Sequence, residues 1–335
     1  MKSYTYIDLF SGAGGMSLGF DEAGFKNLFS IEFNKEFAQT YNKNFPNHKL
    51  IIDDIKNVTE RQIYDIIKNE KVDVIIGGPP CQGFSLAGKI GRNFLDDDRN
   101  RLFKEFVRFV RILKPKVFVL ENVKAMERHN KGKTIQEIVS SFEQIGYEVK
   151  YKVLNAADYG VPQERRRIFI VGTLGKNNFC YPKKENKIVT IQEAIGDLPK
   201  LNNGENSNIP NHKAMHHTKQ MLEKMKYVKD GGNRNDIPEK IRPKSGDSRK
   251  YIRYNSKKPS FCVTGDMRKI FHYNQNRALT CRELARLQTF PDTFIFLGNT
   301  GSVQQQIGNA VPVLLAYKIA LQVKEVLNHE QISKN

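Results

Sequence analysis

The sequence predicts an α/β fold: a doubly wound, Rossmann-like sheet accompanied by a smaller, irregular, β-rich domain. Strand and helix patterns alternate from residue 4 to about residue 173, as they do in parallel sheets covered by helices. Runs rich in Ile, Val, Phe and Tyr predict strands at residues 4–9, 28–32, 49–52, 72–76, 117–121, 148–154 and 168–173, with the clearest helices at 101–113 and 134–145. From about residue 202 to 258 the chain becomes polar and rich in Asn, Gly, Pro and Lys, which indicates a second domain.

The end of the chain is expected to return to the first domain. Helical patterns at 280–288 and 312–327 follow the polar stretch, and the second is apolar enough to pack on the sheet. At 335 residues the chain exceeds one typical domain. We therefore expect a discontinuous domain of residues 1–195 and 309–335, and a second domain with its hinge at 196–308.

Positive charge is concentrated in one stretch. The whole chain carries +18, and residues 211–280 hold 17 Lys and Arg against 6 Asp and Glu. A run of charge is usually only a solvated face, but aromatic side chains are interleaved with this one, as on surfaces that grip phosphates and pack on bases. They are Tyr227, Tyr251, Tyr254, Phe261, Phe271 and Tyr273. The composition therefore predicts a polyanionic partner.

The cysteines indicate neither a metal site nor a disulfide framework. The 4 cysteines are widely spaced, with no Cys-x-x-Cys pair and no histidine at ligand spacing. The sequence shows no signal peptide and no apolar stretch as long as a membrane span. We expect a soluble, cytoplasmic protein whose thiols stay reduced.

Cys81 lies in the run Gly-Gly-Pro-Pro-Cys-Gln-Gly-Phe-Ser of residues 77–85, directly after the predicted strand 72–76. Open α/β sheets bind ligands at the carboxyl ends of their strands. A free cysteine is more often a small buried hydrophobe. Glycines and prolines on both sides nevertheless suit a tight, ligand-facing loop better than a packed core. We interpret Cys81 as a nucleophile.

The first predicted strand leads into a glycine-rich turn, Asp-Leu-Phe-Ser-Gly-Ala-Gly-Gly at residues 8–15. Such glycines let backbone amides and a helix N-terminus approach a ligand closely. Ser17 stands where the dinucleotide fingerprint has Gly or Ala, which disfavours NAD. Glu32, after the second strand, suits two ribose hydroxyls, and Asp54, after the third, suits an exocyclic amine. Each acid alone is more often a surface charge or a helix cap, but the three features in succession predict an adenosine-containing ligand.

Together these motifs resemble those of the DNA cytosine-5 methyltransferases of the bacterial restriction–modification type, from Asp8 to Pro312. Further matches are Glu-Asn-Val at 121–123, Gln-x-Arg-x-Arg at 163–167, the segment 277–292 and Gln-Ile-Gly-Asn-Ala-Val-Pro at 306–312. Val313 replaces the second proline of many relatives, and we interpret this change as neutral because the residue begins a helix. The resemblance implies S-adenosylmethionine as cofactor, no metal, and a cofactor site made of Asp8, Phe10, Ser11, Gly12, Gly14, Gly15, Glu32, Phe33, Asp54, Ile55, Pro79, Pro80, Asn309 and Ala310.

The implied reaction requires these residue types. C5 of cytosine is a poor nucleophile, so a thiolate such as that of Cys81 must first add to C6. Negative charge then develops on N3 and O2, which suits Glu121 at N3 and Arg165 at O2, with Gln163 and Arg167 in the same motif. The structural alternatives are an ion pair between Glu121 and a lysine, and a solvated basic turn for the arginines. No side chain stands out as the base that removes the C5 proton, and a water is an alternative.

A cytosine inside a duplex must leave the base stack to reach Cys81. The resemblance implies that residues 85–101 form a mobile loop that closes over the flipped base. A long polar loop can also be merely solvated. We expect DNA contacts from Gln82, Ser85, Arg99, Arg249, Arg253, Lys257, Lys258 and Arg268.

We therefore predict a methyltransferase that makes 5-methylcytosine in a short duplex sequence. It would act as a monomer on DNA near the nucleoid and protect that DNA against a partner endonuclease. A tRNA cytosine-5 methyltransferase is the near alternative, disfavoured by the basic second domain and the Cys-Gln-Gly-Phe-Ser continuation. A catalytically silent DNA-binding relative is opposed by the intact Cys81, Glu121 and Arg165, and an NAD-dependent oxidoreductase by Ser17 and the thiol loop.

Overall fold

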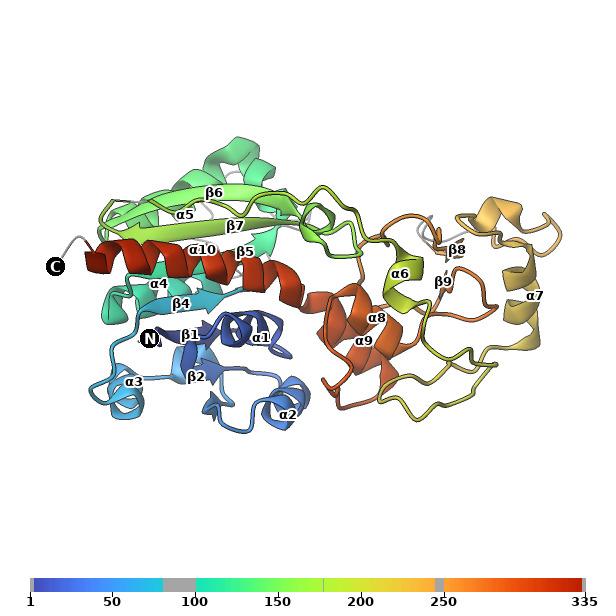
Figure 1. The fold of residues 1–335 in the computed structure, drawn as a ribbon, viewed down its shortest axis with the longest axis horizontal. Helices are drawn as coiled ribbons and strands as arrows, with labels where there is room; N and C mark the ends of the chain where they lie inside the picture. The colour runs from blue at the N-terminus through green and yellow to red at the C-terminus, as the bar shows by residue number, and fades with distance from the viewer. Residues whose placement is uncertain (1–2, 81–100, 177, 245–249, 333–335) are drawn as a thin grey trace. The chain divides into compact units, whose positions relative to one another are not determined.

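The computed structural model describes residues 3–80, 101–176, 178–244 and 250–332 (Figure 1). The chain forms two compact units, each assembled from segments that are distant in the sequence. The first unit contains Met1–Asn155, Arg166–Lys183 and Leu315–Asn335, and the second contains Ala156–Arg165 and Lys184–Leu314.

The first unit is organised around a seven-stranded sheet of order β3-β2-β1-β4-β5-β7-β6. Strand β7 runs antiparallel to its neighbours β5 and β6, and the other neighbouring strands are parallel. The strands are β1 (Thr5–Leu9), β2 (Lys26–Ile31), β3 (Leu50–Ile51), β4 (Val74–Gly77), β5 (Val117–Val123), β6 (Tyr147–Asn155) and β7 (Arg166–Leu174). The predicted Rossmann-like α/β fold is confirmed, while the reversed direction of β7 is a detail that the strand pattern does not reveal.

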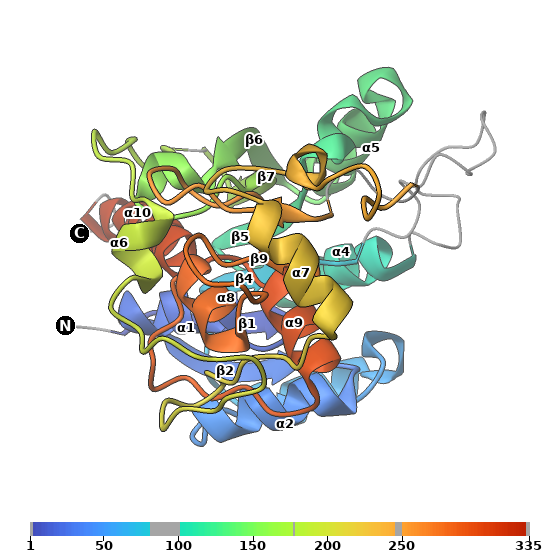
Figure 2. The same cartoon turned by 90° about the vertical axis from the view of Figure 1, so that its right-hand side faces the viewer.

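Helices cover both faces of this sheet (Figures 1 and 2). Helices α1 (Gly15–Glu22) and α10 (Val313–Ile332) lie on one face, and α4 (Arg101–Leu113) and α5 (Lys133–Glu143) lie on the other. Helix α10 is hydrogen-bonded to the residue before β1 and to the residue after α1. Tyr4 donates its hydroxyl to Asn328 Oδ1 at 2.8 Å, and Lys324 Nζ donates to the Ala23 carbonyl at 2.8 Å. Helices α2 (Lys35–Asn44) and α3 (Glu60–Ile67) complete the unit.

Aromatic packing dominates the core on the α4 and α5 face. The Phe118 ring from β5 stacks on Phe142 from α5 with ring centroids 4.0 Å apart, and Phe106 from α4 meets Phe118 edge-on at 6.0 Å. Gly172 on the neighbouring strand leaves the space that the Phe118 ring fills, since a Cβ at Gly172 would overlap that ring. A close-packed interior has no room for the extra methyl group.

The second unit is irregular, as predicted, but its described residues are not β-rich, because loops and short helices take the place of the expected strands. A short parallel pair joins β8 (Ile252–Arg253) to β9 (Ile270–Phe271). The helices are α6 (Ile191–Ile195), α7 (Lys219–Tyr227), α8 (Cys281–Leu287) and α9 (Thr300–Asn309). A small apolar cluster of Met225, Val228, Ile237 and Phe271 anchors α7. Across the described parts of both units, no helix has the length and apolar character that crossing a membrane would require.

Candidate active site

A glutamate and an arginine face each other on neighbouring strands at one end of the sheet. Glu121 lies near the end of β5, and Arg167 lies at the start of the antiparallel strand β7. Arg167 Nε lies 3.0 Å from Glu121 Oε1, and the two side chains are 17% and 11% exposed. Glu121 thus forms an ion pair, as in the structural alternative, but its partner is an arginine and not a lysine. This ion pair fixes the orientation of the Glu121 carboxylate, which keeps a small solvent-exposed area.

The start of the Pro-Pro-Cys loop lies against this carboxylate. A Cβ at Gly78 would sit 3.1 Å from Glu121 Oε2, so glycine permits the close approach. The neighbouring Asn122 donates its amide Nδ2 to the Pro79 carbonyl at 3.0 Å, and its Oδ1 accepts from the Val123 amide at 2.8 Å. The Glu-Asn motif therefore anchors the first residues of the loop. Cys81 itself lies outside the described residues.

The glycine-rich turn after β1 forms an open cradle. Phe10 and Gly12 both have a left-handed φ, 65° and 58°. A Cβ added at Gly12 would meet no atom of the described residues within 4 Å, so space for a ligand opens above it. At Gly14, by contrast, a Cβ would overlap the Phe45 ring. Ser11 ties the turn to the sheet through its amide, which donates to the Ile31 carbonyl at 3.0 Å.

Glu32 closes one side of this cradle. Its Oε2 accepts from the Gly12 amide at 2.8 Å, and its Oε1 accepts from the Asn34 amide at 2.6 Å. Burial raises the pKa of the Glu32 carboxyl, and these amide hydrogen bonds oppose the rise. Each carboxylate oxygen can accept a further hydrogen bond. The next side chain, Phe33, is 71% exposed and offers a bare aromatic face beside the cradle.

Asp8 is buried beneath the glycine-rich turn and does not lie on the open face of the cradle. It is 1% exposed, and its Oδ2 accepts from Ser17 Oγ at 2.6 Å. Burial raises the pKa of Asp8 to about 8. Ser17 also shares hydrogen bonds at 2.9 Å with the Tyr41 hydroxyl, which in turn lies 2.7 Å from Ser30 Oγ. This polar chain links β1, α1, α2 and β2 beneath the glycines. Sequence reasoning singled out Ser17 only as a departure from a fingerprint and missed Tyr41.

Asp54 caps the N-terminus of a short 3-10 helix, Ile55–Asn57, which follows β3. Its Oδ1 accepts from the Lys56 amide at 3.1 Å, and its Oδ2 lies 3.1 Å from Lys56 Nζ. The adjoining Ile55 is buried at 3% exposure. The helix-cap alternative for Asp54 is therefore present in the structure, and its contact with an exocyclic amine stays a prediction.

Two residues of the Gln-x-Arg-x-Arg motif are buried in the second unit. Gln163 donates its Nε2 to the Leu287 carbonyl at 3.1 Å and accepts from the Val263 amide at 2.9 Å. Arg165 is 1% exposed and donates to the carbonyls of Val263, at 3.3 Å, and Gly308, at 2.9 Å. Arg165 thus joins the segment at Val263 to Gly308 at the start of the Gly-Asn-Ala motif, whose Asn309 is exposed and whose Ala310 is half-buried. Its place beside cytosine O2 stays a prediction.

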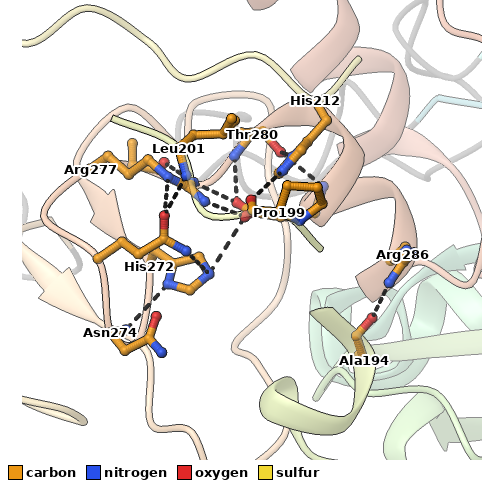
Figure 3. Close-up of polar contacts among 12 residues, drawn as sticks. Ala194, Pro199, Leu201, His212, His272, Asn274, Arg277, Thr280 and Arg286 are labelled. Carbon is orange, nitrogen blue, oxygen red and sulfur yellow. Dashed lines mark hydrogen bonds and ion pairs between the residues drawn. The ribbon is translucent and has the colours of Figure 1, made fainter. Parts of the chain in front are cut away.

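A buried polar network organises the second unit around α8 (Figure 3). Arg277 Nη2 lies 2.6 Å from Glu283 Oε1, and each of these side chains is 1% exposed. His272 lies against the same carboxylate at 3.5 Å, and burial lowers its pKa to about 4. His212 lies 2.9 Å from Thr280 Oγ1 and 3.0 Å from the Pro199 carbonyl. Loss of either partner of this pair would leave an uncompensated buried charge, so the contact holds Arg277 against α8.

The residues predicted to contact DNA fall into three groups. Lys257, Lys258 and Arg268 are exposed on the second unit. Arg253 is buried and donates to the carbonyls of Val228, Met225, His272 and Gln275, so the structure gives its guanidinium an internal bracing role. Gln82, Ser85, Arg99 and Arg249 lie outside the described residues. No group of three or more His, Cys, Asp or Glu within the described ranges could hold a metal ion.

Comparison with known proteins decides the family. The chain matches the C-5 cytosine-specific DNA methylases over residues 4–325. The chain belongs to this family. The Type II methyltransferase M1.HphI of Haemophilus parahaemolyticus is 59% identical over 329 residues, which are 98% of this chain and 88% of that protein. The Type II methyltransferase M.DdeI of Desulfomicrobium norvegicum is 36% identical over an alignment of 365 positions, which covers 94% of this chain and 87% of that protein.

A solved structure agrees with this assignment. A DNA modification methyltransferase encoded within an E. coli prophage superposes with a TM-score of 0.81 at 26% identity, covering 97% of this chain and 100% of that one. The predicted activity is confirmed: this DNA methylase is a DNA cytosine-5 methyltransferase of the restriction–modification type. The tRNA alternative is not favoured.

Proposed function

We propose that this DNA methylase transfers a methyl group from S-adenosylmethionine to C5 of a cytosine flipped out of duplex DNA, through a covalent bond between Cys81 and C6. One observation carries the proposal: Glu121, oriented by Arg167, lies against the start of the loop that leads into Cys81. A nucleophile and an acid are thereby attached to adjacent strand ends, where a single pyrimidine ring could meet both.

The described residues of the first unit fit S-adenosylmethionine. The space above Gly12 accepts a ligand backbone, the remaining lone pairs of Glu32 suit ribose hydroxyls, and the exposed Phe33 ring suits a purine face. Asp54, Ile55, Asn309 and Ala310 are assigned to this site from the motif resemblance. When bound, the cofactor supplies an electrophilic methyl group.

The chain's own residues prepare the cytosine. The Cys81 thiolate forms a bond from Sγ to C6, and the C5–C6 π electrons move toward N3. Glu121 compensates the charge on N3 by hydrogen bonding or proton donation, and Arg165 is assigned to O2. C5 thereby becomes nucleophilic. After methyl transfer, a water accepts the C5 proton, the C5–H electron pair re-forms the C5–C6 double bond, and the Sγ–C6 electron pair leaves with sulfur to regenerate the thiolate. A proton that Glu121 gave to N3 returns to Glu121.

The remaining assignments concern DNA. We propose that residues 1–195 and 309–335 carry the chemistry and that residues 196–308 select the sequence, with the exposed lysines at 257 and 258 contacting phosphates. We also propose that the methylase works as a monomer on DNA, near the bacterial nucleoid. The Type II relatives support a partner endonuclease that acts on the same site.

Two experiments test the chemistry. Bisulfite sequencing of DNA from cells that express the protein should reveal 5-methylcytosine in one short sequence context. A duplex with 5-fluorocytosine at that position should then form a covalent adduct, since fluorine does not leave as a proton does. Cys81→Ala should abolish both signals. Cys180→Ala is the matched control because Cys180 is an exposed thiol of the same chain. Adduct formation by Cys81→Ala would refute the assignment of the nucleophile.

A further inference from the structure

A pocket of about 600 Å³ lies within the second unit beside the start of α9. Lys213, His216 and Arg268 contribute to its walls, together with Asp266, Thr300 and Gln304. The three basic side chains are exposed, whereas Gln304 is buried. The methyl-transfer motifs do not include any of these six residues. The pocket therefore needs an explanation of its own.

Gln304 carries a buried donor that the protein leaves unused. It is 1% exposed, and its Oε1 accepts from the Met267 amide at 3.2 Å. Its Nε2 has no hydrogen-bond partner among the residues that the structure describes. Because Met267 occupies the oxygen, the amide orientation is set and the nitrogen is left to donate. An unsatisfied buried donor is unfavourable, and an acceptor that bonded to it would remove that cost.

The start of α9 adds further donors. Asn299 caps the helix by accepting from the Ser302 amide at 3.0 Å, and the first backbone bond runs from the Val303 amide to the Asn299 carbonyl at 2.9 Å. The amides of Thr300 and Gly301 precede that bond, and both residues line the pocket. The N-terminus of a helix carries partial positive charge and attracts anions.

The pocket is electropositive although it contains a carboxylate. Asp266 is engaged by two cations, with Arg268 Nε at 2.9 Å from Oδ1 and Lys250 Nζ at 3.0 Å from Oδ2. This arrangement holds the Arg268 side chain, which is 72% exposed, beside the pocket. Lys213 adds a further cation, so positive charge exceeds negative charge around Gln304.

We propose that this pocket binds a phosphodiester of the substrate DNA, with Gln304 Nε2 as the buried donor and the α9 N-terminus, Lys213 and Arg268 supplying positive potential. The inference rests on the proposed role of the second unit in gripping DNA. An anionic phosphate suits the donors and the excess positive charge of the pocket, whereas a base edge is neutral and would leave the cations without a counter-charge. Gln304 would thus position the duplex without reading its sequence.

Gln304→Glu tests this assignment. Glutamate keeps an oxygen for the Met267 amide and replaces the donor with a negative charge. Gln305→Glu is the matched control, since it places the same charge on the next, exposed residue of α9, which does not line the pocket. DNA affinity is measured against salt by fluorescence anisotropy on a duplex that contains the methylated sequence. Cofactor affinity and the thermal midpoint report on the integrity of each variant.

Gln304→Glu is expected to weaken DNA binding at least about tenfold at low salt and to reduce the salt slope by about 0.9, the value for one phosphate. The methylated sequence should not change. A duplex series with one neutral methylphosphonate at each position should contain a single position that weakens the wild type but not the Gln304→Glu variant. If the variant is unstable, Lys213→Gln should still lower the slope by about 0.9.

Equal DNA affinity and an equal salt slope for Gln304→Glu and Gln305→Glu would overturn the proposal. A changed target sequence with an unchanged salt slope would also overturn it and would indicate contact with a base. Failure of the proposed function is distinguishable, because it would appear as loss of 5-methylcytosine and of the 5-fluorocytosine adduct in the wild type.

Discussion

Asp8→Asn should change how the stability of the protein depends on pH. Asp8 is buried beneath the glycine turn, and burial raises its pKa from 3.8 to about 8, with Glu32 and Asp21 adding to the rise. Between these two values the unfolded chain carries an ionised Asp8, while the folded protein carries a protonated one. The folded state therefore binds more protons, and stability is lost as pH rises through this range. The slope is about 1.4 kcal/mol per pH unit.

Asparagine cannot ionise but keeps an oxygen that can accept from Ser17. From pH 5 to 7, the free energy of unfolding of Asp8→Asn should therefore rise relative to wild type by about 3 kcal/mol, on top of any constant offset. Urea unfolding followed by far-UV circular dichroism at pH 5, 6 and 7 measures this difference. Asp65→Asn removes a carboxylate that is 70% exposed on α3 and serves as control. Parallel curves for wild type and Asp8→Asn would refute the linkage argument.

Further predictions concern the site and the frame of the second unit. Glu121→Gln should lower the rate of single-turnover methylation by about 10²–10⁴ with cofactor affinity nearly unchanged, whereas Glu32→Ala should mainly weaken cofactor binding. If calorimetric titrations showed that Glu121→Gln mainly weakens cofactor binding while Glu32→Ala leaves it unchanged, the assigned roles of the two acids would be wrong. Gly308→Ala should destabilise the protein by about 1–3 kcal/mol, because its Cβ would lie 2.6 Å from Thr264 C. An unchanged thermal midpoint would show that this contact can relax.

The sequence was informative where function requires a residue type at a strand end. Glu32 and the glycine turn follow β-strands, and Glu121 lies near the end of one, so strand periodicity indicated where all three lie. The hydrogen bond from Asn122 to the Pro79 carbonyl was not predicted from the sequence. The direction of β7 could not be predicted, because side-chain alternation is the same in parallel and antiparallel strands.

The sequence pattern did not predict which side chains contact each other in the folded protein. Arg253 occurs in a basic, aromatic stretch, and composition does not distinguish a surface arginine from one buried among carbonyls. The pairing of Asp8 with Ser17 depends on the turn of α1 back over β1, and Tyr41 joins them from another helix. Gln304 has no sequence signal, since its significance lies in a hydrogen bond that is missing among the described residues.

The way in which the second unit is braced has a consequence for how such an enzyme could change its target. Gln163, Arg165 and Arg253 reach across the unit to main-chain amides and carbonyls. A main-chain group is the same whatever side chain is attached to it. Substitution of neighbouring side chains would therefore leave these hydrogen bonds in place. Under the proposed role of the second unit in selecting the sequence, new targets would be accessible by point substitution while the fold is inherited intact.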